Sequence, residues 1–534
     1  MLQLWVIALL ATVYMHDQIV EGVHRHAPAE PLECWRVVLA LAPFLAIAGI
    51  VQLVCWANGK EIDRRGSLRA IRTADRVLIA SRLTVVVTHV LNVFVLGWVG
   101  QVRAVVGDTI MVDELLAVSP ALLTFIAGWW SYHPIEQRIR RASLIRVLEE
   151  GQPAYPEQSR WQFVWSNIRH QMLFVLVPVG LMGCWSESTT RVLAWMMRQQ
   201  YSSGLVGRVG HWFAHDAAAE VARFAIQLVG IATVFLFTPA LMRLVWDAVP
   251  LGPGPLRDRL MRICDRAGVR VRELLVWRTY GTMVNGAAMG LVAPLRYILL
   301  TDALLDHLPG RQVESVMAHE VGHAKHNHIP WLVLGLMGMM GLIGVGIAIG
   351  LAAVGVATAL LWQGKPSVLA TGFDFAQIGA MPIVLILGFA SFGWISRRFE
   401  WQADAFAAKE LSRDELETKV VTQEAVDAMC GALGAVSNLS HADPRKWSFR
   451  HGSIDTRQRR LLALVGVPLD RLPIDRLVRW IKGGIMVGVA MLVLAIAAPA
   501  ILGGLGELVL RPAPMTELER YRMKFVQSTL EDAP

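Results

Sequence analysis

Residues 319–361 read HEVGHAKHNHIPWLVLGLMGMMGLIGVGIAIGLAAVGVATALL, a polar, histidine-rich segment that leads directly into an apolar run. The run at 330–361 contains no charged residue. A bilayer core takes about 20 apolar residues per helix, so this run is long enough to tilt or to extend beyond the membrane. The junction predicts a water-exposed helix next to a membrane span.

The rest of the chain has the same apolar character. Hydrophobic residues make up 54% of the 534 residues and charged residues only 18%, whereas a soluble domain is usually about a quarter charged. Residues 1–15 are apolar but short and lack a basic leader and an A-x-A site, so we expect a short membrane helix there and not a signal peptide. The other expected spans are 36–57, 83–99, 111–132, 172–186 (which is short), 218–246, 376–396 and 483–504. The expected fold class is mainly α, a multi-pass helical membrane protein with about 8–9 spans and a small β-sheet in a cytoplasm-facing domain.

Basic loops predict how the spans are oriented. The segments 58–82 and 133–171 are rich in Lys and Arg, whereas 100–110 between them holds only Arg103, so both basic loops are expected in the cytoplasm. These loops explain the net charge of +8, and we find no nucleic-acid-binding pattern. The lipid bilayer, and not nucleic acid, is the expected partner, and a bacterial plasma membrane is the expected location.

Counting spans onward gives the expected division of the chain. In the segment 247–329 we expect one helix at 256–267, strands at 274–277 and 297–300, and a weak edge strand at 283–290. The segments are membrane helices 1–246, a first cytoplasmic part 247–329, two spans 330–396, a second cytoplasmic part 397–482, a span 483–504, and a tail 505–534 outside.

HEVGH carries the candidate chemistry. Val313, Val316 and Met317 recur at helical spacing, so His319 and His323, four residues apart, share one helical face. Two imidazoles on one face can hold one zinc ion. The Glu320 carboxylate beside them can act as the general base toward an attacking water.

A catalytic zinc ion needs a third protein ligand. A third histidine of the metzincin type would fall at Ile329 and is excluded. Asp374 lies between the two following spans, on the opposite side of the bilayer, whereas Glu400 follows the returning span and reaches the side of the histidines. Asp404, at i+4 from Glu400, could orient a ligand imidazole. The extra histidines, His326 and His328, are expected to be surface residues.

HEVGH, two spans and then EWQAD at 400–404 resemble the integral-membrane zinc endopeptidases that include the CAAX prenyl protease type I enzymes and the bacterial HtpX-like proteins. The resemblance covers about 250–465 and implies one Zn²⁺ per chain in a helical protease domain with a small sheet. It implies that Asn285, in NGAAMG at 285–290 with Gly where Ala is usual, holds the substrate backbone. It also implies that His451, followed by Gly where Pro is usual, stabilises the oxyanion, and that Arg457 contacts substrate.

These features predict a zinc metalloendopeptidase that acts on membrane-associated or membrane proteins. One alternative is a catalytically idle membrane scaffold or transporter, which the complete set of ligands and base speaks against. Another is a site-2-type intramembrane protease, but Lys325 to His328 are too polar for a bilayer centre. Prenylated peptides and misfolded membrane proteins are equally compatible substrates.

Overall fold

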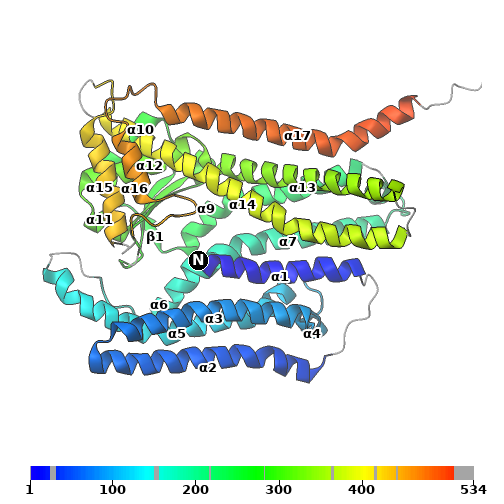
Figure 1. Cartoon of the computed structure of the whole chain (residues 1–534), viewed down its shortest axis with the longest axis horizontal. Coiled ribbons are helices and arrows are strands. Elements are labelled where there is room, and N and C mark those ends of the chain that lie inside the picture. Colours follow the sequence, from blue (N-terminus) through cyan, green and yellow to red (C-terminus); the bar gives the residue numbers. More distant parts are fainter. Residues whose placement is uncertain are drawn as a thin grey trace, which may run out of the picture. The chain divides into compact units, whose positions relative to one another are not determined.

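The computed structural model describes residues 2–23, 32–149, 155–215, 218–281, 283–361, 366–413, 418–439 and 443–509. Most of them are helical, and the predicted multi-pass helical fold with a small sheet is confirmed (Figure 1). Within the described residues, seven helices are long and apolar enough to cross a membrane, and they coincide with seven of the predicted spans. Of the two remaining predicted spans, 376–396 lies inside helix α14 (Pro366–Ser412), and 1–15 falls on a shorter apolar helix, Leu2–His16, outside these seven.

The chain forms two compact units. The first comprises Met1–Asn327, Ala403–Trp447 and Ser453–Asp470, and the second comprises His328–Gln402, Ser448–Gly452 and Arg471–Pro534. Helix α14 passes from the second unit into the first without a break in its backbone. The six-segment division expected from the sequence stays a prediction.

The first unit begins with a bundle of apolar helices. Its helices are α1 (Leu2–Val23), α2 (Cys34–Arg65), α3 (Leu68–Phe94), α4 (Trp98–Val106) and α5 (Val112–Glu149). On α1, Leu2, Val6, Leu9 and Val13 recur at helical spacing and are almost completely buried, so this short helix packs into the bundle core. In Figure 1, α2, α3 and α5 run side by side.

The predicted loop 58–82 is helical, which corrects the sequence-based boundaries. Only Gly66 and Ser67 separate α2 from α3: Gly66 ends α2 at φ +58°, and the Ser67 side chain accepts a hydrogen bond from the Ala70 N–H. Likewise α5 continues through the basic segment to Glu149. The reason is that Lys and Arg are good helix formers whose long side chains reach water from a helix end.

The predicted short span 172–186 is also longer in the structure. α6 (Arg160–Asn167), a π-helical turn (Ile168–Leu173) and α7 (Phe174–Arg198) form one continuous rod, which is itself a candidate span. α8 (Leu205–His215) and α9 (Ala218–Val245) follow. A search for apolar runs begins this span too late, because polar residues lie near the start of the rod.

A four-stranded sheet follows the membrane helices in the first unit. Its strands are β1 (Ala248–Pro250), β2 (Glu273–Trp277), β3 (Gly286–Met289) and β4 (Tyr297–Thr301), in the order β1-β2-β4-β3. β2 and β4 are parallel, the outer pairs are antiparallel, and every residue of β4 is buried. Three predicted strands are confirmed, with β3 at an edge, and β1 is a further strand that the sequence analysis did not predict.

Helices cover this sheet and position the candidate site. They are α10 (Pro255–Ala267), α11 (Asp302–His307), α12 (Gly310–Lys325), the end of α14, α15 (Gln423–Leu439) and α16 (Ile454–Leu462). α10 starts with a proline and ends at Gly268, φ +64°, as the sequence predicts. α12 carries HEVGH and buries Val313, Met317 and Val321.

The second unit contains α13 (His328–Leu361), the first part of α14 and α17 (Pro473–Val509). Glycines on α13 let α17 approach closely. A Cβ atom at Gly338 would lie 3.0 Å from Val489 Cγ2, and one at Gly341 would collide with Leu492 Cδ2. Small residues at such contacts are typical of helix pairs in membranes.

Candidate metal centre

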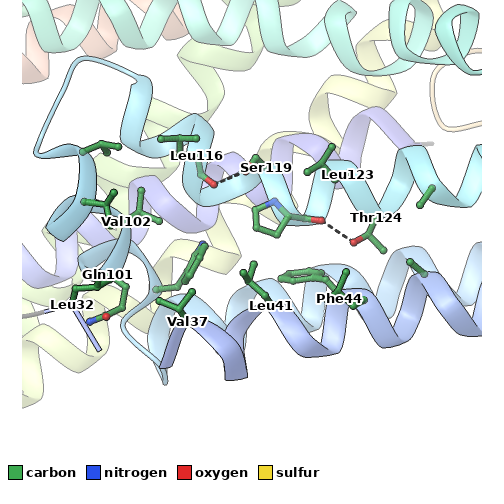
Figure 2. Close-up of a pocket in the computed structure, with 17 residues that line it drawn as sticks. Leu32, Val37, Leu41, Phe44, Gln101, Val102, Leu116, Ser119, Leu123 and Thr124 are labelled. Atoms are coloured by element: carbon green, nitrogen blue, oxygen red, sulfur yellow. Dashed lines mark hydrogen bonds between the residues drawn. The ribbon is translucent and has the colours of Figure 1, made fainter. Parts of the chain in front are cut away.

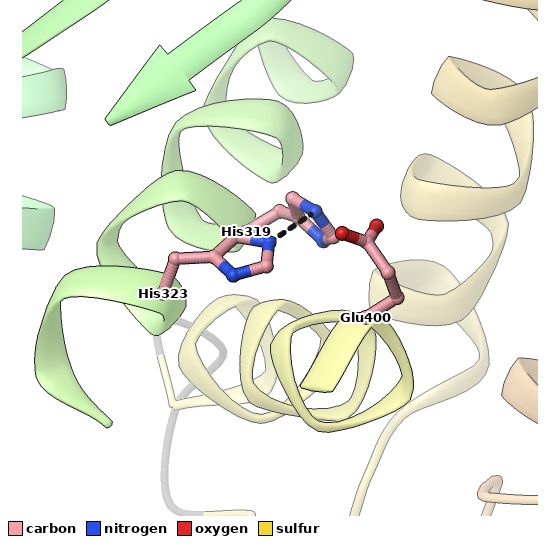
Figure 3. A group of neighbouring side chains, drawn as sticks. All are labelled: His319, His323 and Glu400. Atoms are coloured by element: carbon pink, nitrogen blue, oxygen red, sulfur yellow. Dashed lines mark hydrogen bonds between the residues drawn. The ribbon is translucent and has the colours of Figure 1, made fainter. Parts of the chain in front are cut away.

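Two imidazoles and one carboxylate converge at the end of α12. The candidate ligand atoms of His319, His323 and Glu400 all lie within 4.8 Å of one another (Figure 3). The Nε2 atoms of the two histidines are 3.2 Å apart. Ligand nitrogens about 2.0–2.1 Å from one tetrahedral zinc ion lie about 3.3 Å apart, so the residues fit such an ion.

Asp404 fixes the orientation of His319. One turn after Glu400 on α14, its Oδ1 lies 2.9 Å from His319 Nδ1, and both side chains are almost fully buried. A proton on Nδ1 leaves the Nε2 lone pair for a metal ion. The predicted proximity of Asp404 to a ligand imidazole is therefore present.

Arg457 holds the other side of the Asp404 carboxylate. Its Nε and Nη2 donate to Oδ2 and Oδ1 at 2.8 and 2.6 Å, a bidentate pair between buried groups. Burial raises the pKa of Asp404, but the charge and hydrogen bonds of Arg457, with the hydrogen bond from His319, outweigh it and lower that pKa to about 2. Asp404 is therefore an anion at neutral pH.

Glu320 lies against the edge strand of the sheet. Its Oε2 accepts a hydrogen bond of 2.8 Å from the backbone N–H of Ala288 on β3. A Cβ atom at Gly286 would lie 3.2 Å from Glu320 Cγ and 3.0 Å from Val316 Cγ1. Gly286 thus lets Glu320 lie close to β3, where the Cβ atom of the Ala that is usual in the resembled family would crowd it.

Asn285 stands immediately before β3. Its backbone N–H donates to Thr301 Oγ1 and its carbonyl accepts from the Thr301 N–H, both at 3.0 Å, while the residue is exposed. The backbone is therefore fixed and the residue is open to solvent, as expected for a residue that would contact a substrate chain.

A tight turn brings His451 to Glu400. The backbone groups of Ser448 and Gly452 bond each other in both directions, with Gly452 at φ +76°. His451 Nδ1 lies 2.9 Å from Glu400 Oε2, and about half of the His451 side chain is exposed. The half-exposed ring therefore contacts a candidate ligand through Nδ1.

Sequence reasoning missed several of these contacts. It placed Arg457 and His451 near a substrate, and it did not foresee that they contact Asp404 and Glu400. It was wrong about His328, which is fully buried, stacks on Phe399 and lies 2.9 Å from Gln402 Oε1. The position of His328 directly before an apolar run is only a weak indication that its ring packs against another helix.

Residues 256–465 match the model of Peptidase family M48. Protease HtpX homolog 1 of Sulfolobus acidocaldarius is 27% identical over 177 residues, 31% of this chain and 51% of that protein. CAAX prenyl protease 1 homolog of Oryza sativa subsp. japonica is 27% identical over 161 residues, 30% of this chain and 37% of that protein.

The chain thus spans about half or less of the length of these two relatives. The crystal structure of S. mikatae Ste24p aligns over 82% of this chain and 100% of that chain, with 15% identity and a TM-score of 0.34. The resemblance inferred from HEVGH and EWQAD is confirmed by the family match and the two relatives. Residues 1–255 lie outside the matched region.

Proposed function

We propose that this protein is a membrane-embedded zinc metalloendopeptidase that hydrolyses peptide bonds of membrane-associated or membrane proteins. The observation that carries the proposal is the convergence of His319, His323 and Glu400, with ligand atoms within 4.8 Å, beside Glu320. The match to Peptidase family M48, within which the motif falls, supports a peptidase.

His319, His323 and Glu400 would hold one zinc ion. When bound, zinc would supply Lewis-acid polarisation of the scissile carbonyl and would make a water molecule more acidic. Asp404 keeps the proton of His319 on Nδ1, and Arg457 keeps Asp404 ionised and in place. We assign Arg457 to positioning Asp404, in place of the substrate contact that the resemblance implies.

Glu320 would be the general base. Its carboxylate is on the same helix as the two imidazoles, and the Ala288 N–H donates to its Oε2 at 2.8 Å, which orients the group that would take the proton of the attacking water. The proton then passes from Glu320 to the leaving amine.

β3 and the 448–452 turn would contact the substrate. β3 is an edge strand, so a peptide can add to it as a further strand beside Asn285. His451 would face the oxyanion while its Nδ1 contacts Glu400.

We further propose that the site faces the cytoplasm of a bacterial plasma membrane. The support is the concentration of Lys and Arg in 58–82 and 133–171, since such segments translocate poorly. The HEVGH helix precedes the apolar α13 and lies outside the candidate span His328–Ile347, which favours a site beside the bilayer over an intramembrane one.

Metal analysis of purified variants separates ligands from base. H319A, H323A and E400A should lose zinc and cleavage of labelled casein, whereas E320Q should keep zinc and lose cleavage. H326A is the matched control on the same helix and should keep both. An E320Q protein without zinc, or an E400A protein with full zinc, would sink the assignment. Membrane proteomics of wild type against E320Q would then identify accumulated substrates.

A further inference from the structure

A long apolar cavity lies in the N-terminal bundle, outside the region matched by the protease family. It has a volume of about 590 Å³, within the usual range of about 300–1,000 Å³ for ligand pockets. α2 and α5 form its walls and α4 lies at one end. In Figure 2, Leu41 and Phe44 on α2 face the helix that carries Leu123 and Thr124.

The lining is almost entirely apolar, and its few polar side chains bond to the protein itself. Gln101 Oε1 accepts from the Glu33 backbone N–H at 2.7 Å. Pro120 cannot donate to the Leu116 carbonyl, and the Ser119 hydroxyl donates to it instead, at 2.8 Å. The Thr124 hydroxyl donates in turn to the Pro120 carbonyl at 2.8 Å. Because these polar groups bond to the protein itself, the cavity suits hydrocarbon.

The cavity has the length and position of one lipid tail. On α2 it extends from Val37 to Ala48 and on α5 from Leu116 to Ala127, which is about 16 Å along each helix axis. One leaflet of a bilayer core is about 15 Å deep, half of about 30 Å. Both helices are candidate spans, so the cavity lies on segments expected in the bilayer, and it is too short for a whole transmembrane helix.

Charges near the α4 end of the cavity are paired within the protein. Arg36 lies 3.0 Å from Glu33. Arg103 contacts Asp113 at 2.6 Å and Glu114 at 3.4 Å. Among the described residues, no charged side chain lines the cavity itself. Recognition of a particular headgroup charge is therefore not built into this end.

We propose that this cavity binds one hydrocarbon tail of a membrane lipid, in the leaflet where α2 and α5 begin, with selection by tail and not by headgroup charge. By the predicted orientation this is the leaflet opposite the basic segments 58–82 and 133–171. The site is separate from the candidate metal centre, and its occupancy does not depend on proteolytic activity.

Photo-crosslinking tests the proposal. Full-length protein in phosphatidylcholine vesicles is irradiated with a phosphatidylcholine whose palmitoyl tail carries a diazirine near its methyl end, and labelled residues are mapped by mass spectrometry. Labelling should concentrate on Phe44 and Leu123 and should exceed that of Leu53, an exposed α2 residue outside the cavity. The same probe with a phosphatidylglycerol headgroup should label equally.

Two variants fill the end of the cavity farthest from α4. A48F and A127F should lower labelling of Leu123 by roughly tenfold or more, because extra side-chain volume leaves no space for the tail. A46F places the same side chain on the exposed face of α2 and should leave labelling unchanged. The melting temperature of each variant reports folding.

Three results would overturn the proposal. Equal labelling of Leu53 and Leu123 would show ordinary bilayer contact only. Labelling that follows the headgroup would contradict selection by the tail. A disulfide between two L45C chains in vesicles, with no labelling of the cavity, would show that a second copy of the chain covers it.

Discussion

Replacing Asp404 or Arg457 tests whether this buried ion pair serves the metal, the fold or both. Lowering the pKa of Asp404 from 3.8 to about 2 corresponds to about 2 kcal/mol of stability at neutral pH. Because the folded-state pKa lies below the unfolded-state one, this contribution is present above about pH 4 and is lost as the pH falls toward 2. R457M leaves Asp404 buried without its guanidinium and should cost about 3–5 kcal/mol.

The two substitutions should separate metal affinity from stability. D404N releases the orientation of His319 and should weaken zinc binding about 10–100-fold. R457M should reduce stability more than zinc affinity, since the contact of Asp404 with His319 remains. The double variant D404N/R457M leaves no unpaired buried charge, so it should recover part of the lost stability and none of the lost affinity.

Two measurements on detergent-purified protein check this. Competition with a chelating indicator gives zinc affinity, and tryptophan fluorescence during heating gives the melting temperature. D427N makes the same chemical change at an exposed residue of α15 and should alter neither quantity. Two results would refute the reasoning. One is a D404N protein with the zinc affinity of wild type, and the other is a double variant whose loss of stability equals the sum of the losses in the two single variants.

Two further predictions concern sidedness and the base. The sidedness test uses a chain whose native cysteines are replaced. S203C should react with an impermeant thiol reagent from outside intact cells, and R445C should react only after permeabilisation. Labelling of both positions from one side would contradict the predicted orientation. G286V should press on Glu320 and lower kcat about tenfold or more, with metal content unchanged. A287V, on the opposite face of β3, should leave kcat unchanged. Loss of metal in G286V would point to a structural collapse.

The sequence predicted those parts of the site that local periodicity controls. His319 and His323 share a face because they are one helical turn apart, and Asp404 follows Glu400 by the same interval. Both pairs need only helical geometry. The choice of Glu400 as the third ligand also needed a count of membrane spans. In the structure its carboxylate lies close to the two imidazoles.

The contacts that sequence reasoning missed are tertiary. Arg457 follows Asp404 by 53 residues, and nothing in the local pattern shows that its guanidinium faces a carboxylate on another helix. The same holds for His451 and Glu400. Helix boundaries failed for a different reason: an apolar-run criterion ends a span at the first charges, whereas α2, α3 and α5 remain helical through theirs.

α14 has a mechanical consequence. It is one unbroken helix of 47 residues, about 70 Å long, which holds the expected span 376–396 near its middle and then Glu400 and Asp404. The residues of α14 between the expected span and these two carboxylates are helical throughout. Bilayers of different thickness change the tilt of a spanning rod, and a rod without a joint carries that rotation to its far end. The placement of Glu400 and Asp404 on α14 is therefore tied to the tilt of the expected span in the host membrane.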